Sequence, residues 1–171
     1  MRGGNNVGIK YAISKDAHYV WLLNNDTIIQ TDTLSKLVIA ARLSSEAGLL
    51  SPIIYSYSAP TKAQDCIMLL DKRNYSMKYI KVSEKQALRN GSLLYLWGTA
   101  LFIKRAVVEK VGYLNEKYFA YWEDTEYSHR ALALGYVNKL VPSAIVYHKH
   151  HFTDNDTRNY PPHYFFYMTR N

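Results

Sequence analysis

Apolar and polar positions alternate along this chain in blocks that predict strands and helices in turn. An apolar run at residues 18–23 stops abruptly at Asn24-Asn25-Asp26, which is typical of a buried strand with polar groups at its carboxyl end. The next block has the i, i+3, i+4, i+7 spacing of an amphipathic helix, with an N-cap at Thr31 or Asp32 and Gly48 just beyond its end. We therefore expect polar side chains at the carboxyl edge of a sheet, where open α/β sheets bind their ligands.

The remaining blocks continue the alternation. We expect a glycine-rich turn at Gly3-Gly4 that leads into a short helix to about Ser14, and a strand at 49–55 that Pro52 places at an edge or bulge. Further strands are expected at 65–70, 75–82 and 92–103. Helices at 105–111 and 124–134, closed by Gly112 and Gly135, precede a last strand at 144–147, which is followed by His148. The strands between 65 and 103 predict a partly antiparallel excursion. The whole predicts a single α/β domain over residues 1–171, with a mixed, mostly parallel sheet flanked by helices.

The composition supports one folded domain and limits the classes of molecule that the chain could bind. The 171 residues are 48% hydrophobic and 20% charged, enough for a sizeable core. The formal net charge of +7 would suit nucleic acid, an anionic membrane surface or a phosphate-bearing substrate. Because no basic run is long enough to act as a nucleic-acid arm, we expect no nucleic-acid partner.

The single cysteine and the lack of a long apolar run indicate the cellular compartment in which we expect the protein. Cys66 has no second cysteine to pair with, so a reducing compartment is the simplest expectation. We find neither a signal peptide nor an apolar run of about 18 residues that could span a bilayer. We expect a soluble, cytoplasmic chain, and we leave open a peripheral contact with the inner face of the membrane.

The polar triplet after the first strand allows two interpretations. Asn and Asp are ordinary turn formers, and Asn24-Asn25-Asp26 could be no more than a loop. At the end of a buried strand, however, the carboxylate of Asp26 could coordinate a hard divalent cation that also bridges phosphate groups. Both interpretations stay open on the residues alone.

Three further positions carry the same ambiguity. Asp124 could cap the following helix, or it could act as a general base with a raised pKa, beside the aromatic run 118–122 on which a sugar ring could stack. His148 could be a hydrogen-bonded residue at the end of a strand, or it could bind a ligand. The segment Gly3-Gly4-Asn5-Asn6 could be a simple turn, or it could hold phosphate on its backbone N–H groups.

Several motifs occur together in a characteristic order. They are Gly3-Gly4-Asn5-Asn6-Val7-Gly8-Ile9, Leu22-Leu23-Asn24-Asn25-Asp26-Thr27, Trp97-Gly98-Thr99-Ala100, 111–119 (VGYLNEKYF), Trp122-Glu123-Asp124-Thr125-Glu126, Arg130 and His148. This ordered set resembles the family 2 inverting glycosyltransferases of the GT-A fold, in particular the rhamnosyltransferase-like branch. The resemblance covers essentially the whole chain.

The resemblance implies a role for each matching residue. It makes Asp124 the catalytic base, and it makes Asp26 the ligand of a divalent cation, Mg²⁺ or Mn²⁺, with His148 near that metal or the diphosphate. The remaining residues implied by the resemblance are the donor-binding Gly4, Asn5, Asn6, Asn25, Asp26 and Gly98, and the acceptor- or sugar-contacting Trp97, Trp122 and Glu123. It implies as partners a nucleotide-diphosphate-sugar donor and a saccharide or lipid-linked saccharide acceptor.

Two departures from the family pattern modify these expectations. The family usually has an aspartate two residues beyond the base, where this chain has Glu126. The family domain also opens with a strand, a helix and a strand that hold the nucleotide base, and we find no counterpart of them here. We therefore expect a GT-A-like domain incomplete at its N-terminal edge, which folds, hides the exposed sheet edge in a homo-oligomer and transfers little or no sugar alone. The alternative is a catalytically inactive fragment with only structural or sugar- and nucleotide-binding capacity.

Overall fold

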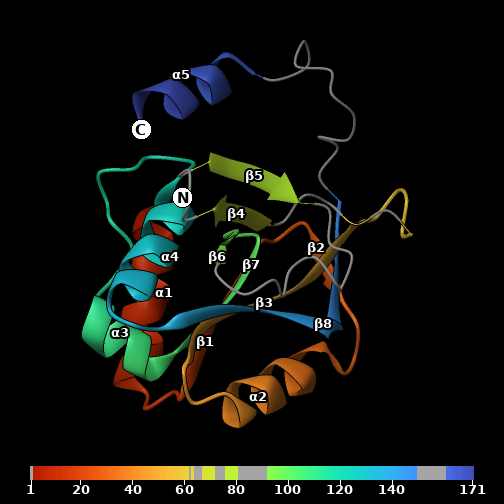
Figure 1. The fold of residues 1–171 in the computed structure, drawn as a ribbon, viewed down its shortest axis with the longest axis vertical. Helices are drawn as coiled ribbons and strands as arrows, with labels where there is room; N and C mark the ends of the chain where they lie inside the picture. Colours follow the sequence, from red (N-terminus) through yellow and green to blue (C-terminus); the bar gives the residue numbers. More distant parts are fainter. Residues whose placement is uncertain (1, 62, 64–66, 72–75, 81–91, 150–160) are drawn as a thin grey trace.

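Figure 1 shows the protein as a computed structural model, which describes residues 2–61, 63, 67–71, 76–80, 92–149 and 161–171. The described elements are, in chain order, α1 (Arg2–Ser14), β1 (Tyr19–Leu23), β2 (Thr27–Ile29), α2 (Thr33–Leu43), β3 (Ala47–Ser56), β4 (Ile67–Asp71), β5 (Ser76–Ile80), β6 (Ser92–Leu96), β7 (Ala100–Lys104), α3 (Arg105–Val111), α4 (Glu123–Ala133), β8 (Val137–His148) and α5 (Pro162–Arg170). The elements follow the predicted order, except that the sequence pattern did not predict β2 and α5. No helix among the described residues is long and apolar enough to cross a membrane.

The central sheet is mixed and has the strand order β1-β7-β3-β8-β2. The pair β3–β8 is parallel and the other pairs are antiparallel, so β1, β3 and β8 run in one direction and β7 and β2 in the other. The predicted α/β class with helices flanking a mixed sheet is confirmed. The carboxyl ends of β1, β3 and β8 share one edge, and at that edge Thr27 pairs with His148.

The predicted antiparallel excursion is a second sheet, with the order β5-β4-β6. The expected strand at 92–103 is wrong in one respect, because the chain breaks at Trp97-Gly98-Thr99 and continues as β7 in the central sheet. Both halves are apolar, so the run gives no sign of the break. Cys66 and the outer ends of the strands expected at 65–70 and 75–82 lie outside the described residues.

The central sheet is covered on both faces. Leu37 and Ala41 of α2 pack with Leu50 and Phe102 on one face, while Ile9 of α1 and residues of α3, α4 and β6 build the larger cluster on the other. Figure 1 shows α2 on one side of the sheet, with α1, α3 and α4 grouped away from it. Neighbouring residues of one strand point to opposite faces, so the strands can bury apolar side chains against helices on both sides. This three-layer packing holds the sheet, and with it the carboxyl edge, in place.

Three local predictions need correction. Gly3-Gly4-Asn5-Asn6 forms no turn, because the helix α1 begins at Arg2 and includes the whole segment. Pro52 lies in β3, an interior strand, although the predicted irregularity is present as a register shift between Pro52 and Ile53 against β8. Pro52 also lies beyond the last β3–β7 pair, at Leu50, so its missing N–H costs no bond to β7.

Gly48 lies within β3 and does not close α2, which ends at Leu43 with Ser44 as its C-cap. A Cβ at Gly48 would lie 2.8 Å from the Cβ of Tyr136 and 2.9 Å from the Cγ2 of Val107. We expect Gly48→Ala to lower the free energy of unfolding by about 1–3 kcal/mol through overpacking.

The matched control is Gly8→Ala, whose new Cβ would meet no atom within 4 Å. Because Gly8 lies inside the helix α1, this change is expected to raise stability by roughly 0.5–1 kcal/mol. Chemical denaturation of both variants measures the difference, and equal stability of the two would contradict the close approach at Gly48.

Candidate active site at the carboxyl edge of the sheet

A tight turn follows β1 and carries the polar triplet. Thr27 donates both its backbone N–H (3.3 Å) and its hydroxyl (2.6 Å) to the carbonyl of Asn24. Asn24 in turn donates its N–H to the carbonyl of Thr99 at 3.0 Å. Asn25 and Asp26 occupy the centre of this turn, so the triplet is a turn and also lies at the sheet edge where a ligand would bind.

Asp26 and His148 come together across the edge of the sheet. The Oδ1 atom of Asp26 and the Nε2 atom of His148 lie 3.2 Å apart, and Lys149 donates its backbone N–H to the carbonyl of Asp26 at 2.9 Å. The His148 side chain is 10% exposed and the Asp26 side chain is 39% exposed. The buried His148 side chain therefore supports the more exposed Asp26 side chain.

Burial lowers the pKa of His148 below its ordinary value, and the neighbouring Asp26 carboxylate partly opposes this shift. A histidine with a lowered pKa is neutral at pH 7, and the neutral ring is the form that can bind a metal ion. The described residues contain no group of three or more His, Cys, Asp or Glu side chains that could hold a metal. Asp26 and His148 would supply two protein ligands to a divalent cation at this edge, and metal binding by them stays a prediction.

Asp124 lies in the first turn of α4 and bonds across to another element. Its Oδ2 atom accepts the backbone N–H of Gly98 at 2.7 Å, and its Oδ1 atom accepts the N–H of Thr125 at 2.6 Å. The N-cap of α4 is Trp122, without a side-chain hydrogen bond, so the alternative of Asp124 as the N-cap is wrong. The carboxylate instead holds the turn between β6 and β7 against the start of α4.

Burial of the carboxyl group raises the pKa of Asp124, and the hydrogen bonds from Gly98 and Thr125 oppose this rise. A raised pKa makes a carboxylate a stronger base while it remains ionised at neutral pH. The direction of the shift is the one that a general base requires.

The turn at Gly98 and Thr99 connects the two carboxylate regions. Thr99 bonds to Asn24 at the end of β1, and Gly98 bonds to Asp124. A Cβ at Gly98 would lie 3.5 Å from the Oδ2 atom of Asp124, an ordinary van der Waals contact, so the glycine turn packs directly against this carboxylate. One short turn thus places the Asp26 turn and Asp124 on neighbouring segments of the same edge.

Three predicted sugar-contacting residues flank this turn. Trp97 directly follows β6, and Trp122 and Glu123 directly precede Asp124. The indole Nε1 atom of Trp122 is buried and has no hydrogen-bond partner among the described residues. Their positions agree with a role near the base, and sugar contact by these residues stays a prediction.

The predicted donor-binding residues of α1 are placed differently from the others. Gly4 is exposed and Asn5 is half-buried on the helix, while Asn6 is buried. The Asn6 amide donates to the carbonyl of Leu114 and to Glu116, each at 2.9 Å, and it accepts the N–H of Leu114 at 3.1 Å. Asn6 thus joins α1 to the segment after α3, and donor binding by these three residues stays a prediction.

Two buried polar residues that sequence reasoning missed support the site from behind. The Ser128 hydroxyl accepts the N–H of Leu96 at 3.1 Å, and the Asn138 amide donates to the carbonyls of Leu94 (2.8 Å) and Ser128 (3.2 Å). These bonds hold β6, and with it the Gly98 turn, against α4. A serine inside a helix and an asparagine inside a strand give no sequence signal for such a role.

Glu126 has a clear structural partner. Arg130 forms a bidentate pair with Glu126, at 2.6 Å from Nε and 2.9 Å from one terminal nitrogen. The same guanidinium donates to the carbonyls of Val111 (2.7 Å) and Tyr113 (2.8 Å). Glu126 therefore holds Arg130 in place through an i, i+4 pair on α4, and Arg130 binds the segment at 111–113.

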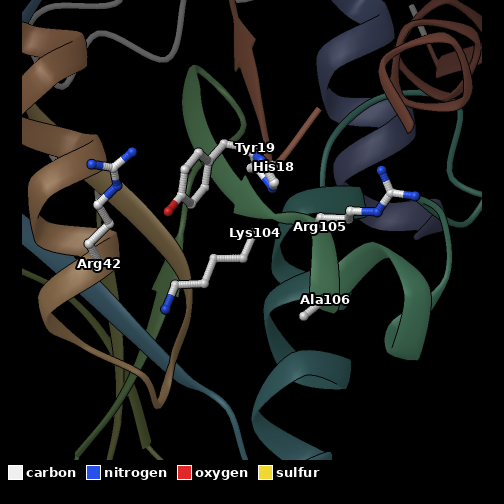
Figure 2. Close-up of a pocket in the computed structure, with 6 residues that line it drawn as sticks. All are labelled: His18, Tyr19, Arg42, Lys104, Arg105 and Ala106. Carbon is white, nitrogen blue, oxygen red and sulfur yellow. The ribbon is translucent and has the colours of Figure 1, made fainter. Parts of the chain in front are cut away.

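A separate cavity of about 380 Å³ lies at the opposite end of the β1–β7 pair, lined by His18, Tyr19, Arg42, Lys104, Arg105 and Ala106. Figure 2 shows the Lys104 ammonium and the Tyr19 hydroxyl on the side facing Arg42, while the Arg105 side chain points away from them. The Arg105 guanidinium is already paired with Glu109 at 2.7 Å and Asp16 at 3.3 Å. This cavity is not part of the Asp26–Asp124 site.

Comparison with known proteins identifies the class. The sequence model of the Glycosyl transferase family group 2 matches residues 19–167, and the chain belongs to this family. The chain is 25% identical over 142 residues to the low-salt glycan biosynthesis hexosyltransferase Agl10 of Haloferax volcanii, covering 75% of this chain and 42% of that protein.

Two further relatives are named as rhamnosyltransferases. The dTDP-rhamnosyl transferase RfbF of Shigella flexneri is 26% identical over 144 residues, covering 84% of this chain and 46% of that protein. The N-acetylglucosaminyl-diphospho-decaprenol L-rhamnosyltransferase of Mycobacterium tuberculosis is 36% identical over 63 residues, covering 36% of this chain and 20% of that protein. The chain thus spans less than half the length of these curated relatives.

Proposed function

We propose that the protein transfers a sugar from a nucleotide-diphosphate donor to an acceptor hydroxyl with inversion at the anomeric carbon. The observation that carries the proposal is the half-buried Asp124 carboxylate, held by the Gly98 N–H beside the turn that bears Asp26. Membership of a glycosyltransferase family supports the reaction class.

In the proposed mechanism the two carboxylates have different tasks. Asp124 accepts the proton of the acceptor hydroxyl as that oxygen attacks the anomeric carbon in line with the leaving diphosphate. Asp26 and His148 would hold a divalent cation, Mg²⁺ or Mn²⁺, whose charge stabilises the leaving diphosphate. The Gly98 turn fixes the direction of the Asp124 carboxylate, which keeps the base and the reacting oxygen in a productive geometry.

The names of the relatives narrow the proposed substrates. One relative is a hexosyltransferase, two are rhamnosyltransferases, and the name of one of these gives an N-acetylglucosaminyl-diphospho-decaprenol acceptor. We extend to this chain a hexose or deoxyhexose donor and a saccharide or lipid-linked saccharide acceptor, in the biosynthesis of a polysaccharide or glycan.

A radiolabelled transfer assay with a panel of nucleotide-sugars and acceptors tests the function. Labelled product is expected to require a nucleotide-diphosphate sugar and a divalent cation, and a chelator should stop its formation. The second candidate is a fragment that binds the donor without transferring sugar. Donor binding without product in every combination would support this second candidate, and low turnover by the chain alone stays a prediction.

Two expectations about assembly also stay predictions. In the described part of the chain, β1 forms one edge of the central sheet, and an open edge can pair with a second copy. Light scattering tests the homo-oligomer, for which a stable monomer would be the contrary result. Co-sedimentation with anionic vesicles tests the peripheral membrane contact.

A further inference from the structure

Two consecutive residues just before the base have left-handed backbone conformations. Tyr121 has φ 66° and Trp122 has φ 73°. Side chains with a Cβ disfavour this region, so two such residues in succession persist only where surrounding contacts hold them. Trp122 also accepts the N–H of Glu126 at 2.8 Å, which starts the first turn of α4, where Asp124 lies. The orientation of the Trp122 peptide therefore sets the orientation of the first turn of α4, and with it that of Asp124.

The C-terminal helix α5 holds this segment from outside. The side-chain amide of Asn171 donates to the carbonyl of Ala120 at 2.8 Å and to that of Tyr121 at 3.0 Å. The ring of Tyr164 packs against the ring of Tyr121, with the centroids 5.1 Å apart. Figure 1 shows α5 lying over the loop that leads into α4, at the end of the molecule where the C-terminus lies.

The loop is held at several points along its length. Tyr167 of α5 packs against Phe119 with ring centroids 5.0 Å apart, and Arg170 donates to the carbonyl of Lys117 at 3.4 Å. Asn171 itself is fixed by its backbone N–H, which donates to the carbonyl of Tyr167 at 3.2 Å. The amide that bonds to the loop therefore belongs to the ordered end of a helix.

We infer that α5 is a clamp that sets the left-handed Tyr121–Trp122 backbone, and that Asn171 is a positioning residue for Asp124 and for the acceptor beside it. This inference rests on the proposed function. Asn171 touches neither base nor substrate, and it acts through the carbonyls of Ala120 and Tyr121. Trp122 carries the effect to the acceptor side, because its buried indole N–H has no partner among the described residues and lies two positions from the base.

The test compares Asn171→Asp with Thr169→Ala. Asn171→Asp keeps the shape of the side chain, removes both N–H donors and turns a negative group toward two carbonyls. Thr169 lies on the same turn of α5, and its hydroxyl donates to the carbonyls of Phe165 (2.9 Å) and Phe166 (3.2 Å), within its own helix. Tyr164→Leu is a second clamp variant, which removes the ring contact without a change of charge.

Amide hydrogen exchange of residues 117–126, measured on the whole chain, reports the clamp without need of activity. Both clamp variants should exchange roughly 5- to 30-fold faster in this segment than the wild type, the change expected for the loss of one or two neutral hydrogen bonds or a comparable contact. Thr169→Ala should leave the segment unchanged. Unchanged exchange in both clamp variants would overturn the inference.

The second readout separates positioning from mere stability. In the transfer assay Asn171→Asp should lower turnover at saturating donor by about 10- to 100-fold, because the base is misplaced, while donor affinity stays as in the wild type. Faster exchange with unchanged turnover would overturn the positioning role. If the wild-type chain binds a donor and forms no product, the second candidate replaces the proposed transfer for this chain, and the exchange measurement still decides whether α5 holds the loop.

Discussion

Replacing Asp124 by asparagine is expected to lower turnover of the complete enzyme by roughly 10²- to 10⁴-fold in the transfer assay, while donor affinity stays nearly intact. The amide cannot accept the proton of the acceptor hydroxyl, so the attacking oxygen loses its general base. Asparagine has the same shape as aspartate and can still accept one of the N–H groups of Gly98 and Thr125, which now bond to the carboxylate. The change therefore separates chemistry from the packing of α4.

The control for this variant is Asp16→Asn. Asp16 lies 108 positions before Asp124 in the sequence. Its side chain is 94% exposed, and it pairs with Arg105 at a distance of 3.3 Å. Its φ of 56° suits asparagine as well as aspartate. We expect normal turnover from this control, since it removes a carboxylate of the same type outside the site.

The pH dependence of turnover gives a second test of the base. Because burial raises the pKa of Asp124, the base takes up a proton at a pH above the ordinary range of an aspartate. Turnover should thus rise with pH through that raised pKa, and this acid limb should be absent in Asp124→Asn. Wild-type turnover by Asp124→Asn would show that Asp124 only joins the Gly98 turn to α4.

Replacing Asp26 by alanine is expected to weaken metal-dependent binding of a nucleoside diphosphate by roughly 30-fold or more, because an anionic ligand of the bridging cation is lost. The Asp26 side chain is 39% exposed, so its removal leaves no cavity in the core. The fold should therefore remain, with His148 still held in β8.

The control is Asp32→Ala, which removes an exposed carboxylate at the start of α2. Asp32 makes an i, i+4 pair with Lys36 at 2.8 Å and no side-chain capping bond. An exposed pair of this kind contributes little to stability, and it lies outside the site. Nucleotide binding by this control should equal that of the wild type, and a comparable loss in both variants would contradict a specific role for Asp26.

The sequence was informative where local signals and packing agree. The apolar run at 18–23 is β1, and the glycines expected to end helices, Gly112 and Gly135, have φ values of 87° and 85° after α3 and α4. Strand β8 begins earlier than the expected 144–147, at Val137, and still ends at His148. Each of these features depends on residues that are neighbours in the chain.

The sequence was uninformative where distant residues decide the conformation. The break at Trp97-Gly98-Thr99 depends on the bond from Gly98 to Asp124, and the two residues are 26 positions apart. The helix through Gly3-Gly4-Asn5-Asn6 is anchored by bonds from Asn6 to Leu114, 108 positions away. No local propensity carries such information, and tertiary contacts override the turn preference of glycine and asparagine.

The same limit applies to the start of α4. The residues predict a cap at Asp124, but α4 begins at Glu123, and its N-cap is Trp122, two residues before Asp124 and in a left-handed conformation. Aromatic residues are poor N-caps, so sequence alone favours Asp124. The contacts from α5, made by residues more than 40 positions further on, allow the observed arrangement.

We propose that Asp26 helps to hold the cation that binds the donor diphosphate and that Asp124 acts as the general base. Isothermal titration calorimetry of a nucleoside diphosphate with Mn²⁺, on the wild type, Asp26→Ala and Asp124→Asn, tests this division most directly. We expect metal-dependent binding in the wild type, nearly equal binding in Asp124→Asn and binding weakened by roughly 30-fold or more in Asp26→Ala. Unchanged metal-dependent binding in Asp26→Ala would contradict the role of Asp26 in holding the cation.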